Sequence, residues 1–203
     1  MKIITYLLSI ALLIVCNLVT AQQKHKLDVQ GKSIVMPENI QNFSWKNFPK
    51  ESASETGYYG WVQFYETPKQ NVQDYFKQNN LELLEYISNS TYLFYFPKRT
   101  HPSVLKNKNV RSIVPVSWEV KVEESLRNGD IPHYAKSGDN ILVTMQLYKN
   151  YDHSKAITDL LAQKIIVKQE YKGYNILELS IPRNCLEALA SQPYVKWIEL
   201  ISA

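Results

Sequence analysis

Two short stretches, VRSIVPVS at residues 110–117 and VKWIELIS at residues 195–202, share one pattern of residue types. Each begins with valine and a basic residue, places isoleucine at the fourth position, and ends in serine after a short apolar alternation. Such alternation is typical of a β-strand. The recurrence predicts that the chain uses one structural unit twice, and this decides the expected fold.

The similarity extends upstream of the two stretches. An offset of 85 positions aligns them and also aligns EY at 85–86 with EY at 170–171, and Pro97 with Pro182. An offset of 83 aligns QFY at 63–65 with QLY at 146–148, so one loop differs by two residues. The register holds over roughly 60 residues of each half, which favours a true internal repeat.

Each half shows the same order of expected elements. The runs WVQFY (61–65) and ILVTMQLY (141–148) are rich in β-branched and aromatic residues and predict strands. Apolar residues at helical spacing follow, with Thr67 and Asp152 as the expected N-caps. Two strands joined by a tight turn come next, and the turns lie at residues 88–90 and 172–173. A short helix then precedes the final strand of each half, which is the stretch quoted first.

The order β-α-β-β-α-β in each half predicts an α+β fold of two tandem ferredoxin-like domains. Each would be a four-stranded antiparallel sheet with two helices on one face. We place the first domain at residues 57–122 and the second at 138–203, with a linker at 123–137. Residues 22–56 are polar and aperiodic and predict an extended N-terminal arm that lies against the first domain.

Residues 1–21 have the pattern of a signal peptide. Lys2 precedes an almost wholly apolar run, and small residues before Gln22 predict cleavage after Ala21. We therefore expect a secreted protein, in the periplasm or at the cell surface, without a membrane anchor after cleavage. A transmembrane anchor and a lipoprotein attached through Cys16 are the alternatives.

Composition and motifs predict a non-catalytic protein. The net charge is +4, and Lys and Arg are scattered among Asp and Glu, so nucleic acid is not an expected partner. After removal of the leader Cys185 is the only cysteine, which excludes an internal disulfide and favours a buried structural thiol. The six glycines form no phosphate-binding loop. The four histidines, His25, His101, His133 and His153, do not have the spacing of metal ligands. We therefore expect no cofactor and no metal.

Aromatic residues concentrate on the expected strands. In TYLFYF (91–96), Tyr92, Phe94 and Phe96 would point to one face of the sheet, and Leu93 and Tyr95 to the other. Large side chains therefore lie on the helix-free face as well. Either the two halves pack on each other through this face, or the face binds another protein.

Several segments resemble the tandem N-terminal propeptides, or fervidolysin-like prodomains, of secreted subtilisin-like serine proteases of bacteria. In the first half these are YYGWVQFYETP (58–68), LELLEYISNSTYLFYFP (81–97) and VRSIVPVSWEVKV (110–122). In the second half YNILELSIPRNCLEALASQPYVKWIEL (174–200) follows the same pattern. The resemblance covers roughly residues 58–200 and is a pattern of hydrophobic positions.

The resemblance implies a protein without catalytic activity of its own. In that family the propeptide packs its open sheet face on the protease, assists folding of the protease and inhibits it until cleavage. The implied partner is a subtilisin-like protease domain, in cis or in trans. The residues implied to contact it lie at the end of the second half: Trp197, Glu199, Leu200, Ile201, Ser202 and Ala203.

The chain lacks the Asp-Thr-Gly, His-Gly-Thr and Gly-Thr-Ser motifs of a subtilase triad. It is therefore expected to be either the proregion of a longer protein or a free-standing relative. As a free-standing protein, the chain would be a secreted inhibitor or a protein-binding module, including an adhesive repeat. A small-molecule-binding domain pair is a further alternative, but the turns ETPK and KNYDHS after the first strands contain no glycine.

Overall fold

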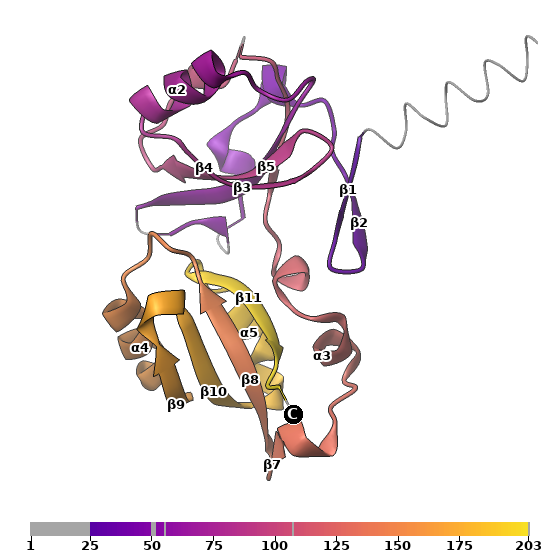
Figure 1. The fold of residues 1–203 in the computed structure, drawn as a ribbon, viewed down its shortest axis with the longest axis vertical. Helices are drawn as coiled ribbons and strands as arrows, with labels where there is room; N and C mark the ends of the chain where they lie inside the picture. Colours follow the sequence, from indigo (N-terminus) through magenta and orange to yellow (C-terminus); the bar gives the residue numbers. More distant parts are fainter. Residues whose placement is uncertain (1–24, 50–51, 55, 107, 203) are drawn as a thin grey trace, which may run out of the picture.

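A computed structural model describes residues 25–49, 52–54, 56–106 and 108–202. The expected signal peptide, its cleavage site, Cys16 and Ala203 lie outside the described residues. The fold is a mixed α+β structure with antiparallel sheets of two, four and five strands. The four-stranded sheet and the five-stranded sheet belong to the first and second halves of the chain, and the halves lie one above the other (Figure 1).

The first half forms the four-stranded sheet, with strand order β4-β5-β3-β6. Asn89 and Ser90 adopt positive φ angles of 46° and 53° and close the hairpin between β4 and β5. A short second helix was expected after Pro97, but here the chain makes only one 3-10 turn, capped by the His101 ring. The elements are β3 (Gly57–Phe64), α2 (Gln70–Gln78), β4 (Glu82–Ser88), β5 (Thr91–Pro97), η4 (Pro102–Val104) and β6 (Val110–Pro115).

The second half forms the five-stranded sheet, with strand order β11-β8-β10-β9. The expectation of four strands was wrong here, because β7 of the preceding connection adds a two-residue ladder to β8. The elements are β7 (Lys136–Ser137), β8 (Asn140–Leu147), α4 (His153–Ala162), β9 (Ile166–Tyr171), η7 (Lys172–Tyr174), β10 (Ile176–Pro182), η8 (Arg183–Cys185), α5 (Leu186–Ala190) and β11 (Val195–Leu200).

The two quoted stretches form the last strand of each half, β6 and β11, which begin at Val110 and Val195. The hairpin strands β5 and β10 keep the same offset of 85, and β3 and β8 keep the offset of 83. In both halves the last strand pairs with the first strand, and a bulge interrupts this pairing. The alignment read from the sequence therefore matches the bounds of these three strand pairs, whereas β4 (Glu82–Ser88) and β9 (Ile166–Tyr171) begin 84 positions apart.

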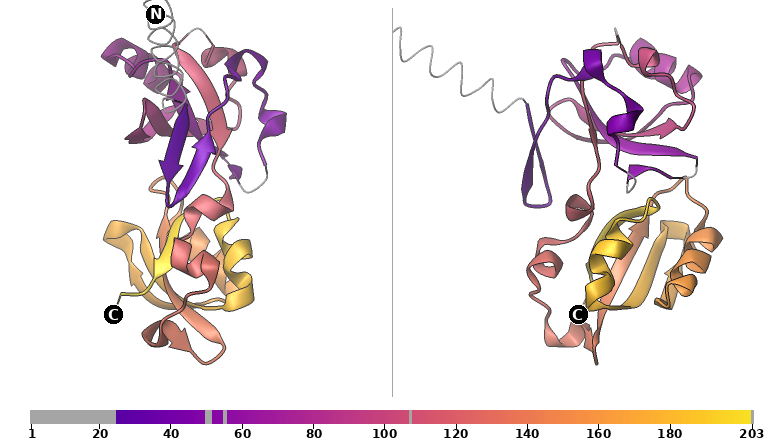
Figure 2. Two further views of the ribbon diagram at one scale, coloured as in Figure 1. Left: turned by 90° about the vertical axis from the view of Figure 1, so that its right-hand side faces the viewer. Right: turned by 180° about the vertical axis from the view of Figure 1, so that it is seen from behind.

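The helices pack on one face of each sheet. Phe76 of α2 is fully buried and meets the ring of Phe94 edge-on at a centroid distance of 5.5 Å. In the second half Leu160 of α4 and Leu189 of α5 are buried in a cluster with Met145 of β8. Seen from behind, α4 and α5 lie in front of the second sheet (Figure 2, right). Burial of these apolar side chains is the main stabilising contribution of both layers.

The two predicted helix caps had different outcomes. The Asp152 carboxylate accepts hydrogen bonds from the backbone N–H groups of Ser154 and Lys155, which confirms it as the N-cap of α4. The prediction of Thr67 as a cap was wrong, because α2 begins only at Gln70. Proline fixes φ but tolerates extended ψ, so Pro68 is compatible with the longer loop as well as with a first helical turn.

The N-terminal segment is not simply extended. It forms a β-hairpin of β1 (Lys26–Val29) and β2 (Lys32–Val35), whose turn residues Gln30 and Gly31 have positive φ angles. Two 3-10 turns follow, η1 (Ile40–Asn42) and η2 (Trp45–Asn47). Sequence periodicity missed this hairpin because each strand has only four residues, and in β2 every residue is at least partly exposed.

The connection between the halves is packed against the second half. It contains η5 (Trp118–Lys121), α3 (Glu124–Asn128) and η6 (His133–Ala135). Four of its buried residues belong to the second hydrophobic core, namely Val122, Leu126, Ile131 and Ala135, whereas Val120 packs against the first sheet. Val122 also forms a parallel bridge with Ile198 of β11. The expected linker at 123–137 therefore includes part of the second core.

Candidate functional site

The helix-free face of the first sheet is covered. Tyr59, Trp61, Leu93 and Tyr95 alternate with the helix-facing residues of β3 and β5, and all four are at most 9% exposed. They form one cluster with Leu27 and Met36 of the N-terminal segment, Val116 and Val120 of the connection, and Tyr148 of the second half. This face is therefore covered within the chain, mainly by the N-terminal segment and the connection. Among the described residues of this cluster, the predicted packing of the two halves on each other is found only at Tyr148.

The halves meet through an aromatic stack. The rings of Tyr59 and Tyr148 lie parallel with a centroid distance of 3.7 Å and an interplanar angle of 6°. The Tyr59 hydroxyl donates a hydrogen bond to the side-chain oxygen of Asn150. Lys196 of β11 forms an ion pair with Glu85 of β4 at 2.8 Å. Residues from both halves therefore build one interface, in which Tyr148 is 2% exposed.

This stack predicts a loss of stability at alkaline pH. Burial raises the pKa of the Tyr148 phenol above its ordinary value of 10.0, as it does for Tyr59. Above pH 10 the unfolded chain therefore releases these protons while the native state retains them, so the free energy of unfolding falls as pH rises. Each such tyrosine contributes a slope of about 1.4 kcal/mol per pH unit.

Urea unfolding at pH 8 to 12 measures this slope. Tyr148→Phe is expected to lower the alkaline slope by about one tyrosine's share, roughly 1.4 kcal/mol per pH unit. Tyr174→Phe is the matched control, because Tyr174 is 74% exposed. Equal slopes in the wild type and in Tyr148→Phe would contradict retention of the Tyr148 proton in the native state.

The helix-free face of the second sheet is open. Figure 1 views this face, and among the described residues no helix or strand lies over it. Ile166 and Tyr171 on β9 are 50% and 39% exposed. The Tyr171 hydroxyl donates to the carboxylate of Glu178 on β10, which shares the face. The face therefore combines exposed apolar surface with fixed polar groups.

Two of the residues implied to contact a protease, Trp197 and Glu199, lie along one margin of this face. Trp197 and Glu199 alternate with the buried Ile198, and the Trp197 indole N–H donates to the Glu199 carboxylate at 2.8 Å. Beyond them, the N–H of Leu200 donates to the Glu123 carboxylate, and the N–H of Ile201 donates to the carbonyl of Leu142. Ser202 is exposed, and Ala203 lies outside the described residues. Trp197 and Glu199 are thus on the open face, whereas Leu200 and Ile201 are held by the second half itself.

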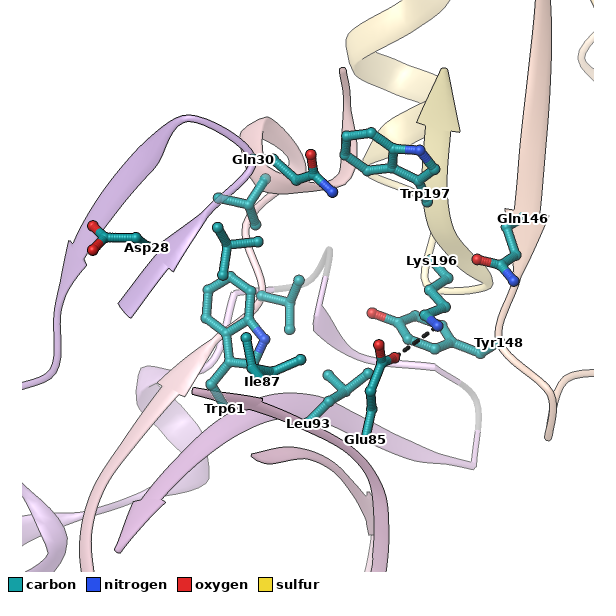
Figure 3. A pocket seen from close by; sticks show the side chains of 13 residues that line it. Asp28, Gln30, Trp61, Glu85, Ile87, Leu93, Gln146, Tyr148, Lys196 and Trp197 are labelled. Carbon is teal, nitrogen blue, oxygen red and sulfur yellow. Dashed lines mark ion pairs between the residues drawn. The ribbon is translucent and has the colours of Figure 1, made fainter. Parts of the chain in front are cut away.

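A cavity of about 430 Å³ opens between the halves (Figure 3). Its inner wall is formed by Trp61 and Leu93 of the first sheet, by Val116 and Val120 of the connection, and by Tyr148. All five residues are buried. Its rim carries Gln30 of the hairpin turn, Gln146, Trp197 and the Glu85–Lys196 ion pair. Sequence reasoning missed this site because its residues come from segments that are far apart in the chain.

The titratable residues show one pair that the sequence did not predict. Nδ1 of His153, at the start of α4, lies 2.9 Å from the carboxylate of Glu170 on β9. Lys172 lies 3.6 Å from the same carboxylate. Cys185 is a free, partly buried thiol. Within residues 25–202, leaving aside the gaps at 50–51, 55 and 107, no group of three or more His, Cys, Asp or Glu side chains could hold a metal ion.

Comparisons with known proteins give one partial match. The family described as Domain of unknown function (DUF8729) matches residues 19–117, which include the hairpin and end just after β6. No curated protein matches the chain, and no solved structure does. Among the described helices none has the length and apolar character needed to cross a membrane. The matched range groups the N-terminal hairpin with the first sheet, in agreement with their shared hydrophobic cluster.

Proposed function

We propose that the chain consists of two ferredoxin-like domains of one repeated design. Three observations support this: the strand orders β4-β5-β3-β6 and β11-β8-β10-β9, the helix after the first strand of each half, and strand offsets that stay between 83 and 85 positions. Written from the last strand, both orders are fourth, first, third, second. In this proposal β7 and the hairpin are local additions to the repeat, and the 3-10 turn η4 stands in the place of the second helix.

The function that we propose is binding of a subtilisin-like protease domain, as a non-catalytic, exported propeptide-type inhibitor and folding aid. The observation that carries it is the open helix-free face of the second sheet, which ends at the strand implied to lie nearest the protease. Because the first sheet's corresponding face is covered, the second sheet is the contact surface of this proposal. Exposed Ile166 and Tyr171 supply apolar contact area, and a patch of this kind is typical of protein-binding surfaces.

Charge adds a second element to this proposed interface. Glu178 and Glu199 lie on the open face, where a carboxylate can interact with the N-terminus of a partner helix. Their orientations are set by hydrogen bonds from Tyr171 and Trp197. A carboxylate held in place binds with less loss of side-chain entropy than a freely rotating one.

Inhibition kinetics test the proposal. The purified chain should inhibit hydrolysis of a peptide substrate by a bacterial subtilisin, and Ile166→Asp should weaken inhibition at least tenfold, because it places a charge in a contact that excludes water. Leu161→Asp is the matched control, since Leu161 is 59% exposed but lies on α4, behind the sheet. It should change the inhibition constant by less than about twofold.

Two results would overturn the protease assignment. One is the absence of inhibition at micromolar concentration of the chain, and the other is equal weakening by Ile166→Asp and Leu161→Asp. The alternative function, a secreted binding module for a partner that is not a protease, is favoured by the same open face. Binding of another exported protein that depends on Ile166, without protease inhibition, would support this alternative.

A further inference from the structure

The cavity between the halves contains two hydrogen-bonding groups without a protein partner. As whole residues, Trp61 is 4% exposed and Tyr148 is 2% exposed, and both line this cavity. Among the described residues, no hydrogen bond is made by the Trp61 indole N–H or by the Tyr148 hydroxyl. The two groups are therefore available to a molecule that enters the cavity, where a few convergent polar groups in an apolar lining are typical of a small-molecule site.

These two groups converge on the same space. In Figure 3 the indole nitrogen of Trp61 and the hydroxyl of Tyr148 point into the cavity from opposite sides. The Trp197 indole contributes a third aromatic wall at the rim, and its own N–H is already bonded to Glu199. A molecule between Trp61 and Tyr148 therefore meets hydrogen-bond donors at its polar group and aromatic or aliphatic surface around the rest.

The charges at the rim favour a neutral molecule. Lys196 and Glu85 neutralise each other at 2.8 Å, and a charged ligand would have to break that pair or remain unpaired near buried apolar side chains. Asp28 points away from the cavity in Figure 3. The volume of about 430 Å³ lies within the range of small-molecule sites, roughly 300–1,000 Å³.

We propose that this cavity binds a small neutral aromatic molecule with a carbonyl or hydroxyl oxygen, which accepts hydrogen bonds from Trp61 and Tyr148. Its planar body packs against Leu93, Val116 and the Trp197 indole. Such a ligand contacts both halves at once and therefore stabilises their arrangement, because it binds only when the halves are packed together. This site shares Trp197 with the proposed protease-binding face, but the proposal does not rest on protease binding and its test contains no protease.

Benzamide is the probe, titrated into the full chain while the tryptophan indole N–H signals are followed by NMR. The Trp61 signal, identified by its loss in Trp61→Phe, should shift with saturation at a dissociation constant on the order of 1 mM, as expected for a fragment of this size. Benzoate, which is charged, and toluene, which lacks the acceptor, should bind at least about fivefold more weakly.

Conservative variants separate the site from a non-specific effect. Trp61→Phe and Tyr148→Phe keep the rings and should each weaken benzamide binding roughly five- to tenfold, measured by saturation transfer to the ligand. Tyr174→Phe should leave the affinity for benzamide unchanged, because Tyr174 is 74% exposed and does not line the cavity. The proposal is overturned if the shifts rise linearly without saturation, if both variants bind as the wild type does, or if benzoate binds more tightly than benzamide.

Discussion

Replacing Tyr148 by alanine is expected to lower the free energy of unfolding by about 3–5 kcal/mol, the usual cost of truncating a buried aromatic side chain. The ring is almost completely buried and stacks on Tyr59 across the two halves. Its removal deletes the central contact of the interface as well as its own buried area. Urea unfolding followed by tyrosine and tryptophan fluorescence measures the loss.

A double-mutant cycle with Tyr59→Ala isolates the stack itself. Contacting aromatic rings contribute about 0.5–1.5 kcal/mol beyond their buried area, so the two losses should be non-additive by that amount. Tyr174→Ala is the control, with an expected change within about 0.5 kcal/mol because its side chain is solvated. A loss below about 1 kcal/mol in Tyr148→Ala would show that the halves do not depend on this contact.

Replacing Arg111 by methionine is expected to cost about 3 kcal/mol, because it removes a buried cation from its hydrogen-bond acceptors. Arg111 on β6 is 7% exposed. Its guanidinium donates to the backbone carbonyl of Met36 at 2.6 Å and to the side-chain oxygen of Gln63 at 2.9 Å. Both acceptors would lose this charged donor, while methionine would fill most of the space.

Thermal unfolding measures this effect, with an expected fall of about 6–12 °C for a chain of this size. Arg99→Met is the matched control, since Arg99 is exposed at the end of the β5 segment and should be nearly neutral. Hydrogen exchange adds a local measurement: amides near Met36 should lose protection before those of the sheet core. Unchanged exchange at Met36 would contradict a role of Arg111 in holding the N-terminal segment.

Arg111 and its counterpart in the second half make different contacts. It occupies the basic position of VRSIVPVS, where the second half has Lys196 in VKWIELIS. The two positions look equivalent in sequence, and both lie in the last strand of their half. Arg111 holds the N-terminal segment to the first sheet, whereas Lys196 forms an ion pair with Glu85 in the other half. Equivalent positions therefore serve different contacts because their surroundings are not repeated.

The hydrophobic pattern predicted the strands and the main helices well. Alternation in TYLFYF predicted that Phe94 and Phe96 lie on one face and that Leu93 and Tyr95 lie on the other. The structure has these two sets on opposite faces, with Phe94 and Phe96 on the helix side. It could not predict which helix-free face would be covered, because large aromatic residues suit internal packing and protein binding equally well. That choice depends on the hairpin at residues 26–35, whose short strands carry little periodic signal.

The sequence by itself therefore determined the order of β3 to β6 and of β8 to β11, the main helices α2, α4 and α5, and the alternation of faces along these strands, because these follow from local periodicity and turn chemistry. Only the tertiary structure decided that the first sheet is covered, that Tyr59 stacks on Tyr148, and that Trp61 and Tyr148 face one cavity. These contacts join residues about 90 positions apart, and their energy depends on how whole surfaces fit together. Local patterns carry no information about such fits.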